Sequence, residues 1–465
     1  MHLLQTTILS LPASMRQHAR VGIFLPSFVI MALLLCSCTP PCVSQVRDLS
    51  EMPQQPAAYL DRMTATTPLV DRSAQHRVAQ HFLTRYFSPW HACGPLEETQ
   101  HPFWALEWLE SNEVFGHNLL PLENKAVTRW QQRCAVAEYP SMTRYAISVA
   151  HTDVRALPTA APMFNDPRQT GEGFPFDYLQ HGVLPAGTPL LITHTSQEGN
   201  WLFIETPLLY GWVPATAVAR VDDAFKDAYI STRYVAVLED GHRLRSTDGG
   251  ALPPTRAGSI LPVLDHTESG YVVAVPHINA QGKAIMGQAS ISRDIARPFP
   301  LPFTPAQVAQ RCSYFMHQPY SWGDRFHGRD CSGTMRDLFT PFGIWLPRNS
   351  GDQSMVGRII DLEETPAPQR RVRIASQAIP FATLLHMRGH IMLYLGEYED
   401  RSVVLHTVWG IRTRSPAGTE GRIRIGKTAI TSLEPGKEKN GIWCRISSLL
   451  ERLDQMNVIH QRSTE

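Results

Sequence analysis

The stretch Arg329-Asp330-Cys331-Ser332-Gly333 predicts the start of a helix that runs from Cys331 to Phe342. Asp330 suits the position before a helix, because its carboxylate accepts hydrogen bonds from N–H groups of the first turn. Gly343 follows the last helical residue, which is typical of a helix end. Three apolar side chains share one face of this helix: Met335, Leu338 and Phe339. We therefore expect a core helix whose first residue is a cysteine.

Cys331 combines a nucleophilic side chain with a helix start. A thiol attacks only as the thiolate, and its ordinary pKa is about 8.5. The unpaired N–H groups and the dipole of a helix start favour an anion, and the N–H of the cysteine itself can point at an oxyanion. Glycines at 323, 328 and 333 let substrate or chain approach closely. A cysteine at a helix start also occurs for structural reasons, so this stretch alone leaves both interpretations open.

Two histidines lie at the ends of a predicted β-hairpin. Residues 391–395 and 402–408 are strand-like, and a polar turn around Tyr398 separates them. A symmetric hairpin centred on Tyr398 makes His390 and His406 cross-strand neighbours, with Cβ atoms about 5 Å apart. One imidazole can then act as a base while the other orients it. The alternative is a pair of ordinary histidines on a sheet, since the chain has 19 of them.

Five stretches resemble the NlpC/p60 peptidases in order and approximate spacing. They are Pro319-Tyr320-Ser321-Trp322-Gly323, Arg329-Asp330-Cys331-Ser332-Gly333, Leu346-Pro347-Arg348-Asn349-Ser350, Gly389-His390-Ile391-Met392-Leu393-Tyr394-Leu395-Gly396 and Leu405-His406. The resemblance implies a papain-like α+β core and a cysteine peptidase that needs no cofactor. It implies Cys331 as nucleophile, His390 as general base and His406 as the orienting third member. Tyr320 matches a tyrosine that assists at the oxyanion. The separation between the two histidines is longer than this family leads us to expect.

The arrangement of the whole chain resembles one branch of that family, the γ-D-glutamyl-L-diamino acid endopeptidases. The resemblance implies cleavage of murein stem peptides after γ-D-Glu. It also implies that the free amine of the peptide's L-Ala is held by Asp330, Ser332 and Ser350. Acidic and tyrosine contacts come from the first SH3-like domain in that branch, and Asp177 and Tyr210 are the residues predicted for them here.

An internal repeat precedes this part of the chain. Short β-rich segments and turns follow one another after Tyr145, and Ala186-Gly187 recurs roughly 70 residues later as Ala257-Gly258. Each copy has the size of a small β-barrel. The Gly-Trp-Val sequence at 211–213 strengthens a resemblance to bacterial SH3-like domains.

These observations predict an α+β multidomain chain. An aromatic-rich, helical N-terminal domain is expected at 76–144, because apolar residues there recur at helical spacing. The other expected units are a signal peptide (1–37), a tether (38–75), two SH3-like barrels (145–220 and 221–297) and a peptidase domain (298–465).

The N-terminus predicts export. Arg16 and Arg20 precede an apolar run at 21–35, which is shorter than the ~20 residues of a membrane span. Met15 is an alternative start. Leu35-Cys36-Ser37-Cys38 resembles a bacterial lipobox, which implies lipidation of Cys38 and a periplasmic lipoprotein, anchored in the outer rather than the inner membrane. An ordinary signal peptide with incidental cysteines is the alternative.

Composition excludes several classes of function. The net charge of +1 and the absence of basic runs interleaved with aromatics argue against nucleic-acid binding. No Cys or His cluster has metal-ligand spacing, so no zinc site is predicted. In an oxidising compartment Cys93 and Cys134 either form a disulfide or remain as two buried thiols, and the sequence leaves both open.

The function expected from the sequence is hydrolysis of the γ-D-glutamyl-diaminopimelate bond in peptides with a free N-terminal L-Ala. An amidase or acyltransferase on the same core is a second reading. A non-catalytic wall-binding lipoprotein is a third, and the complete set of Cys331, His390 and His406 argues against it. The expected partners are peptidoglycan peptides and a membrane. The sequence leaves the oligomeric state open.

Overall fold

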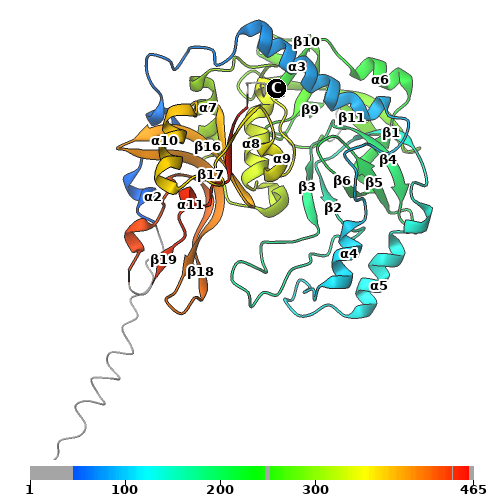
Figure 1. Ribbon diagram of the computed structural model, residues 1–465. Helices are drawn as coiled ribbons and strands as arrows, with labels where there is room; N and C mark the ends of the chain where they lie inside the picture. Colours follow the sequence, from blue (N-terminus) through cyan, green and yellow to red (C-terminus); the bar gives the residue numbers. More distant parts are fainter. Residues whose placement is uncertain (1–45, 247–251, 442–443, 460–465) are drawn as a thin grey trace, which may run out of the picture. The chain divides into compact units, whose positions relative to one another are not determined.

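The computed structural model describes residues 46–246, 252–441 and 444–459. The predicted signal peptide and the lipidation site at Cys38 lie outside these residues. Within the described part of the chain, none of the helices has the length and apolar character needed to span a bilayer. Three antiparallel sheets are combined with helices (Figure 1), which confirms the predicted α+β fold class.

The first sheet lies within the region predicted as the first barrel. Its strands are β1 (Arg144–Ser148), β2 (Thr152–Arg155), β3 (Gln180–Leu184), β4 (Pro189–Thr195), β5 (Trp201–Glu205), β6 (Tyr210–Pro214) and β7 (Val218–Arg220). They are arranged in the order β3-β2-β6-β5-β4-β1-β7. Phe203 and Trp212 are fully buried against Ala105 of the N-terminal helices. Their neighbours Ile204 and Val213 point to the opposite face, into the core of this sheet, because successive side chains of a strand alternate.

The second sheet follows helix α6 (Asp223–Tyr229). Its strands are β8 (Tyr234–Val237), β9 (Arg245–Ser246), β10 (Ile260–His266), β11 (Gly270–Ile278), β12 (Ala284–Ser292) and β13 (Ala296–Pro298). The strand order is β13-β8-β10-β11-β12-β9.

The repeat seen in the sequence corresponds to equivalent turns in the two sheets. Gly187 precedes β4 with φ 85°, and Gly258 precedes β10 with φ 89°. A positive φ of this size favours glycine, because a Cβ atom strains it. The Ala-Gly pair recurs in the sequence because a left-handed turn leads into β4 in the first unit and into the equivalent strand, β10, in the second.

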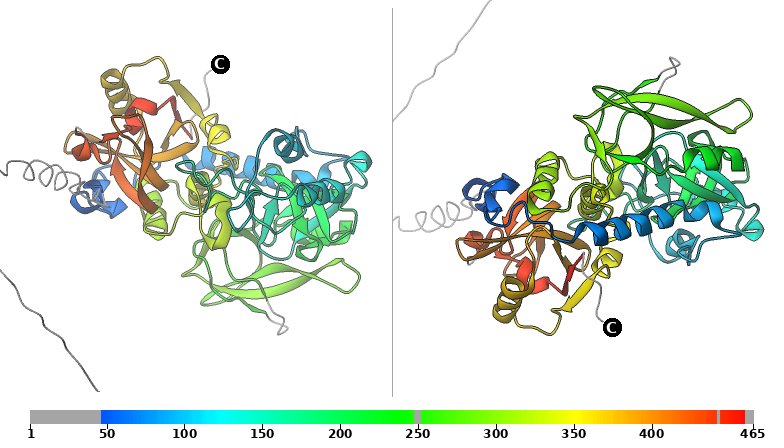
Figure 2. Two further views of the ribbon diagram at one scale, coloured as in Figure 1. Left: turned by 90° about the horizontal axis from the view of Figure 1, so that it is seen from below. Right: turned by 90° about the horizontal axis from the view of Figure 1, so that it is seen from above.

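Helices dominate the N-terminal part of the described chain. They are α2 (Asp48–Glu51), α3 (Arg72–Phe87), α4 (Trp104–Ser111) and α5 (Asn124–Arg133), with short 3₁₀ turns at Pro56–Tyr59, Ser88–His91 and Val136–Glu138. Figure 2 shows α3, in blue, running along both the green and the yellow parts of the chain. Gln75 on α3 donates to the carbonyl oxygens of Leu301 and Phe342, and Tyr86 donates to that of Gly187. This helix therefore joins the C-terminal domain to the first sheet.

The predicted tether is wrong over residues 46–75. Asp48 is 5% exposed and accepts hydrogen bonds from the N–H and hydroxyl of Ser432, at 2.7 and 2.8 Å. The side chain of Gln54 bonds the carbonyl and N–H of Ile430. Polar, Pro-containing sequence suggested a linker, but its polar groups complete the edge strand of the C-terminal sheet.

The C-terminal domain packs helices against the third sheet. Its helices are α7 (Pro305–Phe315), α8 (Cys331–Phe339), α9 (Ser350–Ser354), α10 (Ala367–Gln377) and α11 (Leu449–Arg452). Its strands are β14 (Arg358–Asp361), β15 (Thr383–Met387), β16 (His390–Tyr398), β17 (Arg401–Arg414), β18 (Glu420–Ser432), β19 (Arg445–Ile446) and β20 (Gln455–Val458). The order is β14-β20-β15-β16-β17-β18, with β19 beside β17.

The predicted apolar face of α8 contacts this sheet. Met335, Leu338 and Phe339 are fully buried in one cluster with Ile391 and Leu405. The helix is shorter than predicted, because a 3₁₀ turn at Thr340–Phe342 ends it before Gly343. Burial of this face holds the first residue of α8 beside the strands that carry the two histidines.

Candidate active site

Asp330 caps α8 as the sequence predicts, since its side chain accepts a hydrogen bond from the N–H of Gly333 at 2.8 Å. Gly333 has no room for a side chain. A Cβ atom there would lie 1.9 Å from Oδ1 of the fully buried Asp324. Cys331 follows the cap, is 8% exposed and lines a cavity. The helix start therefore presents the thiol to a cavity and is rigidly held on its other side.

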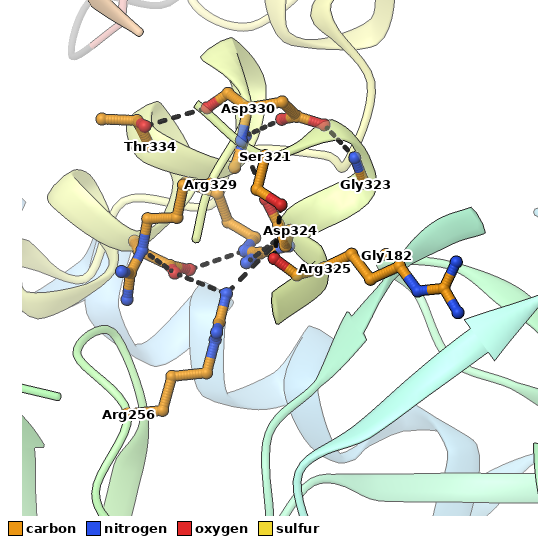
Figure 3. A network of polar contacts seen from close by, with 12 residues as sticks. Gly182, Arg256, Ser321, Gly323, Asp324, Arg325, Arg329, Asp330 and Thr334 are labelled. Carbon is orange, nitrogen blue, oxygen red and sulfur yellow. Dashed lines mark hydrogen bonds and ion pairs between the residues drawn. The ribbon is translucent and has the colours of Figure 1, made fainter. Parts of the chain in front are cut away.

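Buried hydroxyls connect this helix start to the sheet. Thr334 donates to the carbonyl oxygen of Asp330 at 2.8 Å (Figure 3), and its oxygen lies 2.6 Å from that of Thr407. Thr407 in turn contacts the hydroxyl of Thr428 at 2.7 Å. Since Thr407 follows His406 on β17, these contacts fix the position of the nucleophile's helix relative to the histidine strand.

The hairpin differs from the predicted one in register. Tyr398 pairs with Arg401, so the turn is formed by Glu399 and Asp400, both with positive φ, rather than centred on Tyr398. The prediction of direct cross-strand neighbours is wrong, because this shift makes the two histidines diagonal to each other. They still meet: Nε2 of His390 lies 2.9 Å from Nδ1 of His406.

Burial governs the charge state of all three side chains. It raises the pKa of Cys331 to about 12, and the carboxylate of Asp330 raises this pKa further. The hydrogen bond from the N–H of Ile391 lowers the pKa but does not offset burial. Burial also lowers the pKa of His390 to about 3 and that of His406 well below its usual range. The expected thiolate at the helix start is therefore not the resting state, because desolvation outweighs the helix start. The thiol and both imidazoles are therefore neutral, so a thiolate can form only if the thiol proton is transferred to a base.

These shifts predict acid sensitivity of the fold. Burial lowers the pKa of His151 and His181 to about 4 and that of His390 to about 3, from 6.5 in the unfolded chain. The stability that neutral histidines contribute is complete above pH 6.5 and is lost as pH falls through this window, because the unfolded chain then binds more protons. In a His390→Ala variant, unfolding at pH 5 should take up about one proton fewer. Urea unfolding between pH 4 and 7 measures this difference, and equal proton uptake in both proteins would contradict the assigned burial effect.

Tyr320 is close to the thiol. Burial raises the pKa of Tyr320 well above its usual value, and the charge of Asp330 acts in the same direction. Its ring lies in an aromatic group with Phe176 and Trp409, at centroid distances of 6.3 and 5.9 Å. The phenol therefore stays protonated and can donate a hydrogen bond to an oxyanion.

The cavity in front of Cys331 has a volume of about 720 Å³. Six of the predicted site residues line it: Cys331, Tyr320, Asp330, Ser332, Ser350 and Tyr210. Tyr210 comes from β6 of the first sheet and Ser350 from the start of α9, so the cavity lies between two domains. Neither histidine lines the cavity, and both are buried, since His390 is 7% exposed and His406 is fully buried.

Asp330 is paired with Arg348, which the sequence analysis did not assign a role. Both guanidinium ends contact the carboxylate, at 2.7 and 3.1 Å, and Arg348 also donates to the hydroxyl of Ser332. Gly323, Ser332 and Gly333 donate to the same two oxygens. Burial raises the pKa of Asp330, but Arg348 outweighs it and holds the pKa below its usual range. Five protein donors therefore saturate a carboxylate that was expected to contact a substrate amine.

Asp177 is not brought to the cavity. It is 2% exposed and forms buried ion pairs with Arg155 at 2.7 Å and Arg325 at 2.5 Å. The N–H groups of Met163 and Leu179 also donate to it. Its surroundings therefore correct the predicted substrate contact, because the first sheet uses this carboxylate to bind the loop that carries Arg325.

Other cavity residues come from segments that the sequence suggested were core. Trp104 of α4 lines the cavity and stacks on His181, with a centroid distance of 5.4 Å. Its indole N–H donates to Nε2 of His181, whose Nδ1 contacts the carbonyl oxygen of Tyr210. Trp322 and Arg348 also line the cavity, and the sequence could have indicated them, because both lie within the stretches that resemble the family. No sequence pattern indicated Trp104 or His181 as cavity residues, because their position depends on how the domains pack.

A buried charge network surrounds this region (Figure 3). Arg329 bonds Asp337 of its own domain and Asp240 of the second sheet's unit, each at 2.7 Å. Arg256 of that unit lies 3.5 Å from Asp337. Removing one partner from such a network leaves a buried unpaired charge. The network therefore fixes the second β unit against the loop that precedes Cys331.

Within the described residues, no group of three or more His, Cys, Asp or Glu side chains could hold a metal ion. Cys93 and Cys134, which were considered as a disulfide, are an exposed and a buried free thiol.

Comparison with known proteins identifies three segments. Residues 317–417 match the NlpC/P60 family, residues 27–139 match its N-terminal stabilising domain, and residues 162–214 match an SH3 domain of the SH3b1 type. A γ-D-glutamyl-L-lysine dipeptidyl-peptidase of Bacillus subtilis (strain 168) is 35% identical over 65 residues. That match covers 14% of this chain and 22% of the curated relative.

One solved structure shows the same fold over most of this chain, and a second is similar to a lesser degree. An NlpC/P60 endopeptidase from Photobacterium damselae subsp. piscicida has a TM-score of 0.78 at 24% identity, covering 89% of this chain and 98% of that one. An NlpC/P60 family protein from Bacillus cereus ATCC 10987 has a TM-score of 0.46 at 16% identity, covering 67% and 98%. The C-terminal domain of this chain is therefore similar to the NlpC/P60 family, and the regions before it are similar to the stabilising domain of that family and to an SH3 domain of the b1 type.

Proposed function

We propose that this chain is a cysteine endopeptidase that hydrolyses the γ-D-glutamyl-diaminopimelate bond of peptidoglycan stem peptides. The observation that carries the proposal is the contact of 2.9 Å between His390 and His406, on strands that pack against the helix beginning at Cys331, whose thiol lines a cavity that Tyr210 of the SH3 unit also lines. The curated relative of Bacillus subtilis acts, by its name, on a γ-D-glutamyl-L-lysine bond. An anchor at Cys38, inferred from sequence, would hold the enzyme at a membrane near this substrate.

The reaction begins when Nδ1 of His390 takes the proton of the Cys331 thiol. The thiolate attacks the γ-carbonyl carbon of D-Glu, and the N–H of Cys331 and the phenol of Tyr320 stabilise the oxyanion. The C–N bond breaks as His390 returns its proton to the leaving amine of the diamino acid. Water, deprotonated by His390, then hydrolyses the thioester and releases the γ-carboxyl group and the thiol.

The amine of the N-terminal L-Ala needs an acceptor other than the saturated Asp330. Ser332 and Ser350 line the cavity, as does Asp352, whose carboxylate accepts a long hydrogen bond of 3.4 Å from Asn349. Asp352 and Tyr210 line the same cavity; burial raises the pKa of Tyr210, and the charge of Asp352 adds to this shift. We assign the charged contact to Asp352, with the two serines as hydrogen-bond acceptors.

This assignment predicts a preference for peptides with a free amine. L-Ala-γ-D-Glu-diaminopimelate should be cleaved with a kcat/KM about 10- to 100-fold higher than its N-acetylated form, because a charge-assisted contact contributes roughly 1.5–3 kcal/mol. Mass spectrometry of the products measures both rates and identifies the bond. Equal values would show that the amine is not recognised.

Matched variants locate the contact. Asp352→Asn should raise KM for the free peptide and remove most of the preference. Glu98→Gln is the control, since Glu98 lines the same cavity but is paired with Arg85 at 3.3 Å. Trapping of the acyl-enzyme by hydroxylamine without hydrolysis would favour the acyltransferase reading, and wall binding without any product would favour the binding protein.

A further inference from the structure

His406 is enclosed between two polar partners. It is fully buried, and its two ring nitrogens contact His390 and Thr431. Nε2 lies 3.2 Å from Oγ1 of Thr431, which is also fully buried. Thr431 belongs to β18, where it pairs with Val404 of β17, so the sheet holds its hydroxyl beside the imidazole.

The hydroxyl of Thr431 has one proton to donate. Oγ1 donates it to the carbonyl oxygen of Ser432 at 2.9 Å, the shorter of its two contacts. A carbonyl oxygen only accepts, so the second contact must be one in which Thr431 accepts. Nε2 of His406 therefore carries a hydrogen and donates it to Oγ1.

The same reasoning extends to His390. A neutral imidazole has one N–H, so Nδ1 of His406 is an acceptor once Nε2 carries the hydrogen. The contact of 2.9 Å is then a hydrogen bond from Nε2–H of His390 to Nδ1 of His406. Nδ1 of His390 is left with a lone pair, which is the form needed to accept a thiol proton.

We propose that Thr431 is a positioning residue that sets the tautomers of both histidines and so keeps His390 competent as the base. This inference rests on the proposed function for the role of His390, although the tautomers themselves do not depend on the substrate. Without the hydroxyl, Nε2–H of His406 would be buried without an acceptor. His406 would then carry its hydrogen on Nδ1 and donate to Nε2 of His390, which places the remaining hydrogen of His390 on Nδ1, toward the thiol.

Three variants test this. Thr431→Val keeps the shape of the side chain but removes the hydroxyl, whereas Thr431→Ser retains it. Thr383→Val on β15 is the matched control, because Thr383 is fully buried in the same sheet and its hydroxyl accepts the N–H of Ile379, at the end of β15 opposite to Met387, which pairs with His390. We expect Thr431→Val to lower kcat by about 10- to 100-fold with little change in KM. This loss in kcat is smaller than the ~10⁴-fold loss that a wrong tautomer causes in a serine protease triad. Thr431→Ser and Thr383→Val should stay within about threefold of the wild type.

Nitrogen-15 spectra of the histidine rings provide a readout that is independent of cleavage. In the wild-type protein at pH 7 both His390 and His406 should show the hydrogen on Nε2, and in Thr431→Val both should show it on Nδ1. The rate of Cys331 alkylation by iodoacetamide should fall in parallel. If the wild type alkylates at Cys331 but cleaves no stem peptide, the proposed substrate is wrong while the spectra still decide the role of Thr431.

Two results would overturn the inference. One is a wild-type spectrum in which His406 carries its hydrogen on Nδ1. This test uses the wild-type protein alone, so its outcome does not depend on whether a variant folds. The other is a folded Thr431→Val protein with unchanged tautomers and wild-type alkylation, which would leave Thr431 a purely structural residue.

Discussion

Replacing Cys331 with alanine should lower the rate of peptide cleavage by at least ~10⁴-fold while the protein remains folded. The thiol supplies the attacking atom, and no other cysteine among the described residues lines the cavity. The helix start does not depend on the sulfur, because Asp330 caps it through the N–H of Gly333. Cleavage of the free tripeptide and thermal unfolding of the same preparation measure the two effects separately.

Cys312 provides a matched control for the loss of a buried thiol. It is fully buried on α7 in the same hydrophobic cluster as Cys331, but it does not reach the cavity. Cys312→Ala should cost about 1 kcal/mol of stability and leave cleavage per folded molecule unchanged. Activity above a few per cent in Cys331→Ala would refute the assignment of the nucleophile.

His390→Ala should be nearly as damaging as the loss of Cys331, since the two residues act as a unit and their effects are not additive. The thiol has a pKa of about 12, so without a base almost none of it ionises at pH 7. His406→Gln should cost less, about 10- to 100-fold, because the amide oxygen of glutamine can still accept the hydrogen bond from Nε2 of His390. Measured kcat values for His390→Ala and His406→Gln show which loss is larger. The double variant of His390→Ala with Cys331→Ala tests whether the two effects are additive.

His386 is the control for a buried histidine of the same sheet. Its Nδ1 lies 2.6 Å from Asp454, and it pairs with Ile391 across β15 and β16 without lining the cavity. His386→Gln should therefore retain activity per folded molecule. If His406→Gln were as inactive as His390→Ala, the roles of base and orienting residue would have to be exchanged.

The local features of the site were predictable from sequence. Asp330 caps α8 because a capping side chain bonds an N–H only three residues further along the chain. The hairpin followed from two strand-like runs around a polar turn, and the Ala-Gly repeat marked the left-handed turns at Gly187 and Gly258. Cys331, His390 and His406 also follow one another in the order that the resemblance to the NlpC/P60 family predicts, within the residues that match the family.

Other features depend on contacts between residues far apart in the chain. Only the packing of the sheet reveals the register that makes the histidines diagonal, the hydroxyl of Thr431 beside His406 and the bidentate contact of Arg348 with Asp330. The position of Trp104 at the cavity and of Asp177 away from it likewise depends on how the domains meet.

The charge state of the site is the clearest case of a property that the sequence leaves undetermined. A helix start favours a thiolate at Cys331, and that much is local. Burial raises the pKa of the thiol and lowers those of both histidines, because closing the core and the cavity around them removes the water that would stabilise their charged forms. The sequence thus indicated the candidate reacting residues and the local turns that hold them, whereas the tertiary structure determined the protonation of these residues, because desolvation depends on everything packed around a group.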